Sequence, residues 1–271
     1  MFLCMCQVAK SQNTGILLVH YGTQNDKSRR ATLDRLNEEV AHTFHHCKVM
    51  EAYAASSVIA MLNKRGIHKS SIAAALDSLH AQGCDTLIVQ STMLLDGMMM
   101  DLLQEQVKKV KSFFKRVSVA RPLLYSVQDC RRLINLISSH LSSQKLYRTD
   151  EAQIVLVGHG SDSPANAMYS QIDYLAKDEG YSNWHVGTIE GYPTLESVQR
   201  QLAKNKQKHV VLVPLLYIAG NHQREDIAGV WKQAFVKNGY QVTVVDEGLG
   251  EMSEMRKMIL DNIKKIIEEN E

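Results

Sequence analysis

The sequence lacks paired cysteines, a charge excess of one sign and any long apolar run. None of its five cysteines is spaced as C-x-x-C and their number is odd, which argues against a disulfide framework and a structural zinc site. Lys and Arg total 31 against 29 acidic residues, so the net charge of +2 provides no basic field for nucleic acid.

No segment approaches the ~20 apolar residues of a membrane helix. The first six residues lack the basic and long apolar regions of an export signal. We therefore expect a cytoplasmic protein with reduced, mostly buried thiols and no nucleic-acid or membrane partner. The cysteines are Cys4, Cys6, Cys47, Cys84 and Cys130.

Several catalytic motifs are also missing. Gly158-His159-Gly160-Ser161 does not have the Gly-x-Ser-x-Gly order of a nucleophile elbow. No Walker loop or Gly-x-Gly-x-x-Gly loop follows the first strand-like segments. Hydrolase and nucleotide-binding functions are disfavoured accordingly.

Short apolar runs alternate with amphipathic stretches along the whole chain, which is the pattern of βα units that build a parallel sheet. With 45% hydrophobic and 22% charged residues, the chain can form one large or two medium domains. We predict a first half over 13–143 and a second over 150–271, with the polar segment 142–151 as connector. The predicted strands are 15–20, 47–53, 86–90, 117–120, 153–157, 184–189, 209–213 and 241–245.

The two halves repeat one another in sequence. Residues 15–23 align without gaps to 153–161, and 85–97 align to 208–220. The first alignment places Tyr21 opposite His159, and the second, extended by two residues, places Met99 opposite His222. Since related halves that face each other usually form a cleft, one half is expected to supply the chemistry and the other a wall.

Three metal-ligand candidates lie at equivalent places in the second half. His159 follows its first predicted strand, Glu190 follows the second, and His222 lies in the loop after the third. In open α/β sheets the carboxyl ends of the strands meet at one edge, where ligands bind. Two imidazoles and a carboxylate leave coordination positions open, as catalytic rather than structural sites do. Each residue alone also has a structural explanation: an unusual turn for His159, a cap or ion pair for Glu190, and a helix start for His222.

These segments resemble the class II tetrapyrrole chelatases, and most closely the anaerobic-type sirohydrochlorin cobaltochelatases. The resemblance covers nearly the whole chain and implies two Rossmann-like, chelatase-like halves, each a mostly parallel four-stranded sheet flanked by helices, with an active-site cleft between them. The matching segments are Tyr-Gly-Thr at 21–23, Ser-Arg-Arg-Ala-Thr-Leu at 28–33, Val-Gly-His-Gly-Ser at 157–161, Ile-Glu-Gly-Tyr-Pro at 189–193 and Val-Pro-Leu-Leu-Tyr-Ile-Ala-Gly-Asn-His at 213–222.

The resemblance implies that His159, Glu190 and His222 bind the metal and remove pyrrole protons. A neutral histidine suits both tasks because its pKa of ~6.5 lies near neutrality. The implied reaction is insertion of Co²⁺ into sirohydrochlorin or a related tetrapyrrole on an anaerobic cobalamin route, with the metal as substrate and no organic cofactor. Fe²⁺ or Ni²⁺, a haem-like substrate, metal removal, and a non-catalytic tetrapyrrole or metal carrier stay open as alternatives, as does a homo-oligomer.

The first half departs from the family pattern at the place where contacts with the tetrapyrrole are expected. Where the family usually has Gln-Pro-Leu-His and Gly-Glu-Glu, this chain has Gln-Ser-Thr-Met at 90–93 and Gly-Met-Met-Met at 97–100. We interpret the methionines as an adaptable apolar wall; the alternative is an altered substrate or a thioether near the metal. Tyr21 and Met93 are the expected wall contacts. Arg29 is a candidate partner for substrate carboxylates, or else a solvated residue of a first helical turn.

Overall fold

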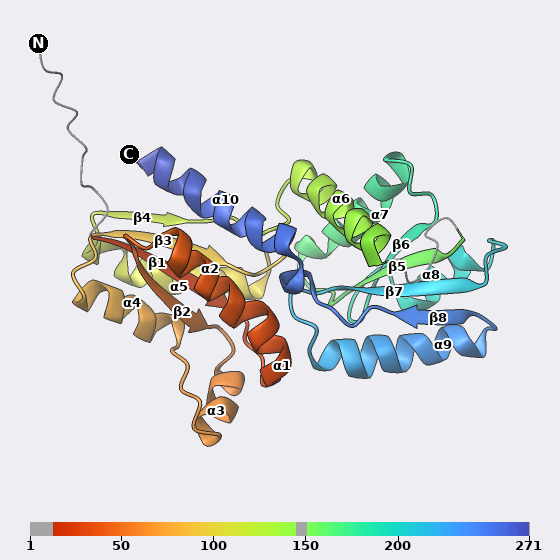
Figure 1. Ribbon diagram of the computed structural model, residues 1–271, viewed down its shortest axis with the longest axis horizontal. Helices are drawn as coiled ribbons and strands as arrows, with labels where there is room; N and C mark the ends of the chain where they lie inside the picture. Colours follow the sequence, from red (N-terminus) through yellow and green to blue (C-terminus); the bar gives the residue numbers. More distant parts are fainter. Residues whose placement is uncertain (1–12, 145–150, 271) are drawn as a thin grey trace, which may run out of the picture.

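The computed structural model describes residues 13–144 and 151–270, and shows two parallel sheets of four strands arranged end to end (Figure 1). Strand order is β2-β1-β3-β4 in the first sheet and β6-β5-β7-β8 in the second, so the halves share one topology. The fold therefore confirms the prediction of two similar α/β halves. The strands of the first sheet are β1 (Thr14–His20), β2 (Lys48–Tyr53), β3 (Thr86–Ser91) and β4 (Arg116–Val119). Those of the second are β5 (Gln153–Gly158), β6 (Trp184–Thr188), β7 (His209–Leu215) and β8 (Gln241–Val244).

Each observed strand agrees with its predicted range to within two residues at either end. The central strands are apolar along their whole length because helices cover both faces of each sheet. In β1, for example, Ile16 and Leu18 are buried on one face, while Leu17 and Val19 are buried on the other. The register places His20 beside Tyr53 in β2, and Gly158 of β5 beside Thr188 of β6.

Helices and helical turns follow the strands in both halves. Helix α3 is an addition to the predicted elements; Val58 and Leu62, four residues apart, are its buried positions. The segments η1 and η4 are π-helical. In the first half the elements are α1 (Asp26–Arg29), η1 (Arg30–Asp34), α2 (Arg35–Thr43), α3 (Ser56–Lys64), α4 (Ile72–Ala81), α5 (Met98–Val110), η2 (Lys111–Phe113) and α6 (Val127–Gln144). In the second they are η3 (Pro164–Asn166), α7 (Ala167–Asp178), α8 (Leu195–Leu202), η4 (Gln223–Trp231), α9 (Lys232–Lys237), η5 (Leu249–Glu251) and α10 (Ser253–Asn270).

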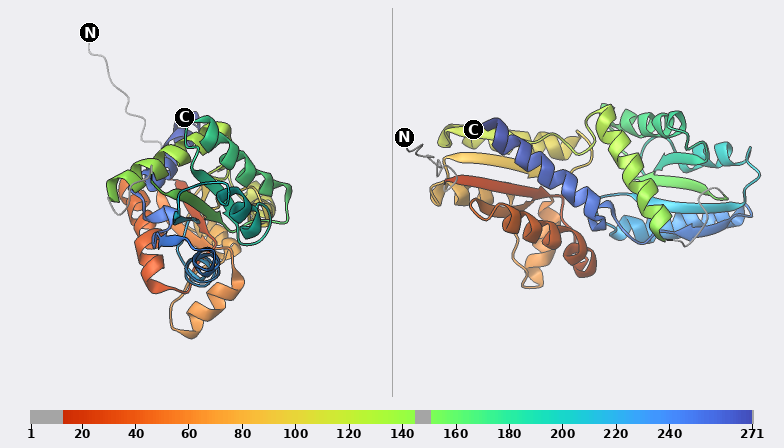
Figure 2. Two further views of the ribbon diagram at one scale, coloured as in Figure 1. Left: turned by 90° about the vertical axis from the view of Figure 1, so that its right-hand side faces the viewer. Right: turned by 45° about the horizontal axis from the view of Figure 1, so that its top comes forward.

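Two long helices cross between the halves. Helix α10 follows the last strand of the second sheet but runs back over the first, where it contacts β3 and α2 (Figures 1 and 2). Helix α6, which follows the last strand of the first sheet, packs against α7 of the second. One apolar cluster consequently runs through both halves, from Ile16 in β1 through Ile259 in α10 to Ile154 in β5. The division at 143–150 follows the repeat in the sequence, whereas the packing crosses it; six residues of the predicted connector, 145–150, lie outside the described residues.

The described cysteines are free thiols. Cys84 and Cys130 are buried and Cys47 is half-buried, as expected for cysteines that serve in packing. Burial raises the pKa of the Cys130 thiol to about 11, so it stays protonated and poorly nucleophilic. Cys4 and Cys6 lie outside the described residues. Within the described ranges, none of the helices is both long and apolar enough to cross a bilayer.

Candidate active site

The structure brings His159 and His222 together. His159 follows the end of β5 and is exposed, while His222 directly precedes η4 and is half-buried. Their ring centroids are 4.7 Å apart and the rings are nearly perpendicular, at 86°. Two residues separated by 63 positions in sequence therefore form one imidazole pair at the carboxyl edge of the second sheet, as expected for adjacent parallel strands.

Each imidazole has its Nδ1 atom next to an oxygen that can only accept a hydrogen bond. His222 Nδ1 lies 2.8 Å from Asp226 Oδ2, and His159 Nδ1 lies 3.1 Å from the carbonyl oxygen of Gly160. In a neutral imidazole the nitrogen that donates carries the proton and the other nitrogen carries a lone pair. Both histidines therefore present the lone pair at Nε2, where it can bind a metal ion or accept a proton.

The turn that carries His159 depends on two glycines. A Cβ atom on Gly158 would lie 2.2 Å from the ring of Tyr169, and one on Gly160 would lie 1.3 Å from the carbonyl oxygen of Glu190. Gly160 also has a φ of +94°, which side chains with a Cβ rarely adopt. The Gly160 N–H donates to the Tyr169 hydroxyl at 3.2 Å, and burial raises the pKa of that phenol, which therefore stays protonated. This turn is closely packed beneath an exposed imidazole.

The backbone of Glu190 contacts this turn. Its N–H donates to the carbonyl of His159 at 2.7 Å, and its side chain is exposed. Among the residues that the structure describes, no three His, Cys, Asp or Glu side chains are grouped so as to hold a metal ion. The histidine pair is thus observed, whereas a metal-binding role of the Glu190 carboxylate stays a prediction.

Loops of the first half meet this edge directly. A Cβ on Gly97, before α5, would lie 3.8 Å from the hydroxyl oxygens of Ser161 and Ser163, in the loop after His159. A Cβ on Gly220, two residues before His222, would lie 3.8 Å from the Thr23 hydroxyl oxygen. The loops after β1 and β3 therefore face those after β5 and β7, as the repeat predicts.

The expected wall residues of the first half differ in exposure. Tyr21 is 51% exposed and Met98 is 75% exposed, Met93 is half-buried, and Met100 is buried. The methionine run is thus divided between the core, where Met100 packs, and the surface, where Met98 can contact a ligand. Tyr21 and Met93 as tetrapyrrole contacts stay predictions.

Arg29 is neither solvated nor unpaired. Its side chain is 10% exposed, and its guanidinium contacts Asp26 at 2.6 Å and Asp34 at 3.2 Å. A pairing of Arg29 with substrate carboxylates stays a prediction, and it would compete with these two carboxylates.

A buried histidine lies directly before Tyr21. His20 bonds Thr92 Oγ1 at 3.2 Å through Nδ1 and Asn37 Oδ1 at 3.0 Å through Nε2. Burial lowers its pKa, so this imidazole stays neutral near neutral pH. Thr92 lies within the segment where the family pattern has Gln-Pro-Leu-His, and here it serves as a hydrogen-bond partner inside the core.

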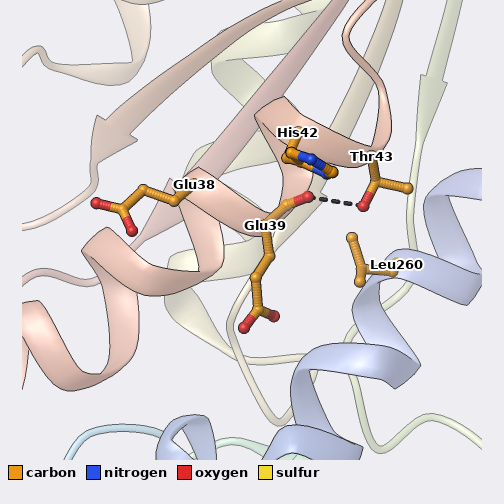
Figure 3. A pocket seen from close by; sticks show the side chains of 5 residues that line it. All are labelled: Glu38, Glu39, His42, Thr43 and Leu260. Carbon is orange, nitrogen blue, oxygen red and sulfur yellow. Dashed lines mark hydrogen bonds between the residues drawn. The ribbon is translucent and has the colours of Figure 1, made fainter.

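Two surface hollows of the described chain lie elsewhere. The first, of about 340 Å³, is lined by Glu38, Glu39, His42 and Thr43 of α2 and by Leu260 of α10 (Figure 3). The second, of about 420 Å³, lies between α6 and α10. Neither hollow includes His159 or His222. The predicted cleft is therefore supported by the facing loops and not by these hollows.

Two supporting residues are additions to the predicted site. Asp226 stands four residues after His222 on the same helical segment, a spacing that brings side chains together. That spacing is visible in the sequence once His222 is suspected. Tyr169 has no comparable local signal, because its contact with Gly160 depends on how α7 packs beside β5.

Two parallel sheets that meet at their carboxyl edges, with an imidazole pair at the junction, define the class of two-half α/β metal chelatases. Residues 14–268 match the family described as cobalt chelatase (CbiK), and the chain therefore belongs to that family.

Known proteins of this kind are similar over almost their whole length. The sirohydrochlorin cobaltochelatase of Salmonella typhimurium is 26% identical over 257 residues, which cover 93% of this chain and 96% of that protein. The sirohydrochlorin cobaltochelatase CbiKC of Nitratidesulfovibrio vulgaris is 28% identical over 255 residues, covering 92% and 89%. The structure of SirB from Bacillus subtilis with Fe³⁺ is similar in fold, with a TM-score of 0.71, 16% identity, and coverage of 93% of this chain and 95% of that one.

Proposed function

We propose that this protein inserts Co²⁺ into sirohydrochlorin or a closely related tetrapyrrole, in the cytoplasm and on an anaerobic cobalamin route. The observation that carries the proposal is the His159–His222 pair, 4.7 Å between ring centroids, in a chain that belongs to the cobalt chelatase family. Its relatives in Salmonella typhimurium and Nitratidesulfovibrio vulgaris bear the name sirohydrochlorin cobaltochelatase. The metal is a substrate of the reaction, and no organic cofactor is proposed.

Metal insertion requires that the ion lose water and that two pyrrole N–H groups lose their protons. The Nε2 lone pairs of His159 and His222 can each serve one of these steps, because both Nδ1 atoms are engaged with acceptors. A neutral imidazole accepts a pyrrole proton or replaces a water molecule on the ion. The exposed carboxylate of Glu190, whose backbone contacts His159, would offset the positive charge that collects as metal and protons meet.

In this proposal the second half, 150–271, supplies these groups and the first half, 13–143, holds the macrocycle. The exposed Tyr21 and Met98 are suited to lie against its flat face, since the loops that carry them meet the second-half loops. The first half would thus restrict the orientation of the substrate, while the histidine pair would perform the chemistry.

The test is a spectroscopic assay without oxygen. Purified protein is mixed with sirohydrochlorin and excess Co²⁺, and absorption reports formation of the cobalt complex. We expect multiple turnovers in wild type and in a His45→Ala control, which replaces an exposed histidine after α2. His159→Ala and His222→Ala should each lose nearly all turnover. A one-to-one spectral change without turnover in wild type would refute the catalytic proposal and support a tetrapyrrole carrier instead.

A further inference from the structure

The loop that carries His222 is held by the first half of the chain. This loop, residues 216–222, joins β7 to η4. The Ser28 hydroxyl, in α1 of the first half, donates to the carbonyl of Ala219 at 2.5 Å. Ser28 is only 8% exposed, so this hydrogen bond is shielded from water. A first-half side chain is therefore fixed to the backbone three residues before a site histidine.

Ser28 is itself held in place by its own helical turn. The Asn25 side chain caps the helix by accepting from the Ser28 N–H at 3.0 Å, and the Ser28 carbonyl accepts from the Thr32 hydroxyl at 2.6 Å. Arg29, the next residue, is tied to the carboxylates described above. With both backbone groups of Ser28 engaged, its hydroxyl has a defined direction toward the second half.

The turn into η5 also confines this loop. Gly248, at the turn into η5, passes so close that a Cβ atom there would lie 2.5 Å from the Ala219 nitrogen. The N–H groups of Leu249 and Gly250 donate to the carbonyls of Leu216 and Tyr217 at 2.8 and 2.9 Å. The loop is therefore held both by the η5 turn and by the Ser28 hydroxyl, and the hydrogen bond from Ser28 resists a shift of the loop away from the first half.

We propose that Ser28 is a positioning residue for His222, acting through the Ala219 carbonyl. Loss of its hydroxyl removes this restraint, so that the loop can move away from the first half and the position of the His222 imidazole relative to His159 changes. This inference rests on the proposed metal-insertion function and extends it, because it gives the first half a part in the chemistry beyond that of a wall. A small misplacement of a reacting group can lower rates by about 10²-fold, and weakened support of a ligand lowers activity by about 10- to 100-fold.

The test compares Ser28→Ala with Ser28→Thr and with Ser57→Ala, a control on the exposed surface of α3. We expect Ser28→Ala to lower kcat roughly 10-fold, with KM for the tetrapyrrole changed less than about twofold. Ser28→Thr, which keeps the hydroxyl, should recover most of kcat. Co²⁺ affinity is measured by calorimetry without tetrapyrrole, and should fall several-fold in Ser28→Ala only.

Wild-type kcat and wild-type Co²⁺ affinity in folded Ser28→Ala would overturn the proposal, as would equal losses in Ser28→Ala and Ser28→Thr. If Ser28→Ala does not fold, it is replaced by Ser28→Cys, a nearly isosteric variant whose thiol is only a weak hydrogen-bond donor. The same losses of kcat and of Co²⁺ affinity are then expected of Ser28→Cys, and wild-type values would overturn the proposal. If wild type binds Co²⁺ but shows no turnover, the proposed function fails while the affinities still decide the role of Ser28. If wild type does not bind Co²⁺ at all, both proposals fail.

Discussion

Removal of the Asp226 carboxylate provides a quantitative test of how His222 is oriented. The carboxylate accepts a hydrogen bond from His222 Nδ1 at 2.8 Å, which fixes the proton on Nδ1 and leaves the Nε2 lone pair available. Hydrogen bonds to charged groups contribute about 1.5–3 kcal/mol. The two side chains are 45% and 31% exposed, so water weakens the interaction and we take the lower end. In Asp226→Ala we therefore expect a loss of about 1.5 kcal/mol in the free energy of Co²⁺ binding, which is slightly more than about tenfold in affinity.

Two further variants separate the hydrogen bond from the charge. Asp226→Asn keeps an acceptor oxygen without the charge and should lose less than Asp226→Ala. Glu225→Ala removes the same charge one residue earlier, at an exposed position. Co²⁺ titration by calorimetry and turnover of sirohydrochlorin are measured for all three. Equal affinities in Asp226→Ala and Glu225→Ala would refute the orienting role, since general charge would then explain any loss.

Three other predictions concern the turn, the core and the wall. Gly160→Ala should lower the midpoint of thermal unfolding and abolish turnover, because a methyl group there overlaps a backbone oxygen at 1.3 Å and φ is +94°; a stable, active variant would contradict this packing. Burial lowers the pKa of His20 and of His185 below 6.5, so the unfolded chain binds more protons in acid. These two histidines should not reduce the free energy of unfolding above pH 6.5. Below pH 6.5 each should reduce it by at most about 1.4 kcal/mol per pH unit, until the pH passes the lowered pKa of the folded state. His20→Gln should reduce this slope in urea unfolding, and an unchanged slope would contradict the prediction. Met98→Ala should raise KM for the tetrapyrrole roughly 3- to 10-fold without changing kcat, as lost apolar burial would, whereas Met61→Ala on α3 should not; equal KM values would remove Met98 from the wall.

The sequence predicts the sheets well because both faces of each central strand are buried. Runs such as Ile16 to Val19 and Ile154 to Val157 can satisfy their apolar side chains only between two helical layers. The repeat between the halves adds the common topology. The position of the histidine pair also follows, because His159 directly follows β5 and His222 comes after β7, the neighbour of β5 in the sheet.

Other features depend on tertiary contacts that leave no periodic signal. The amphipathic pattern of α10 shows that Ile259 and Ile263 are buried, but not that they pack on the first sheet. The sequence predicts an Arg29 guanidinium that is solvated or available to substrate carboxylates, because Asp34 becomes its partner only through the π-helical turn. The bond from Ser28 to Ala219 joins positions 191 residues apart and cannot be inferred from either segment alone.

The return of α10 to the first half has a consequence for how the protein is made. A ribosome releases a chain from its amino end, so β1 and β3 are synthesised long before their covering helix. Until Ile259 and Ile263 emerge, the face of the first sheet with Ile16, Leu18 and Ile88 lacks part of its apolar cover. The nascent first half therefore exposes apolar surface until α10 has been synthesised, and this part of the core is completed only after that helix is available.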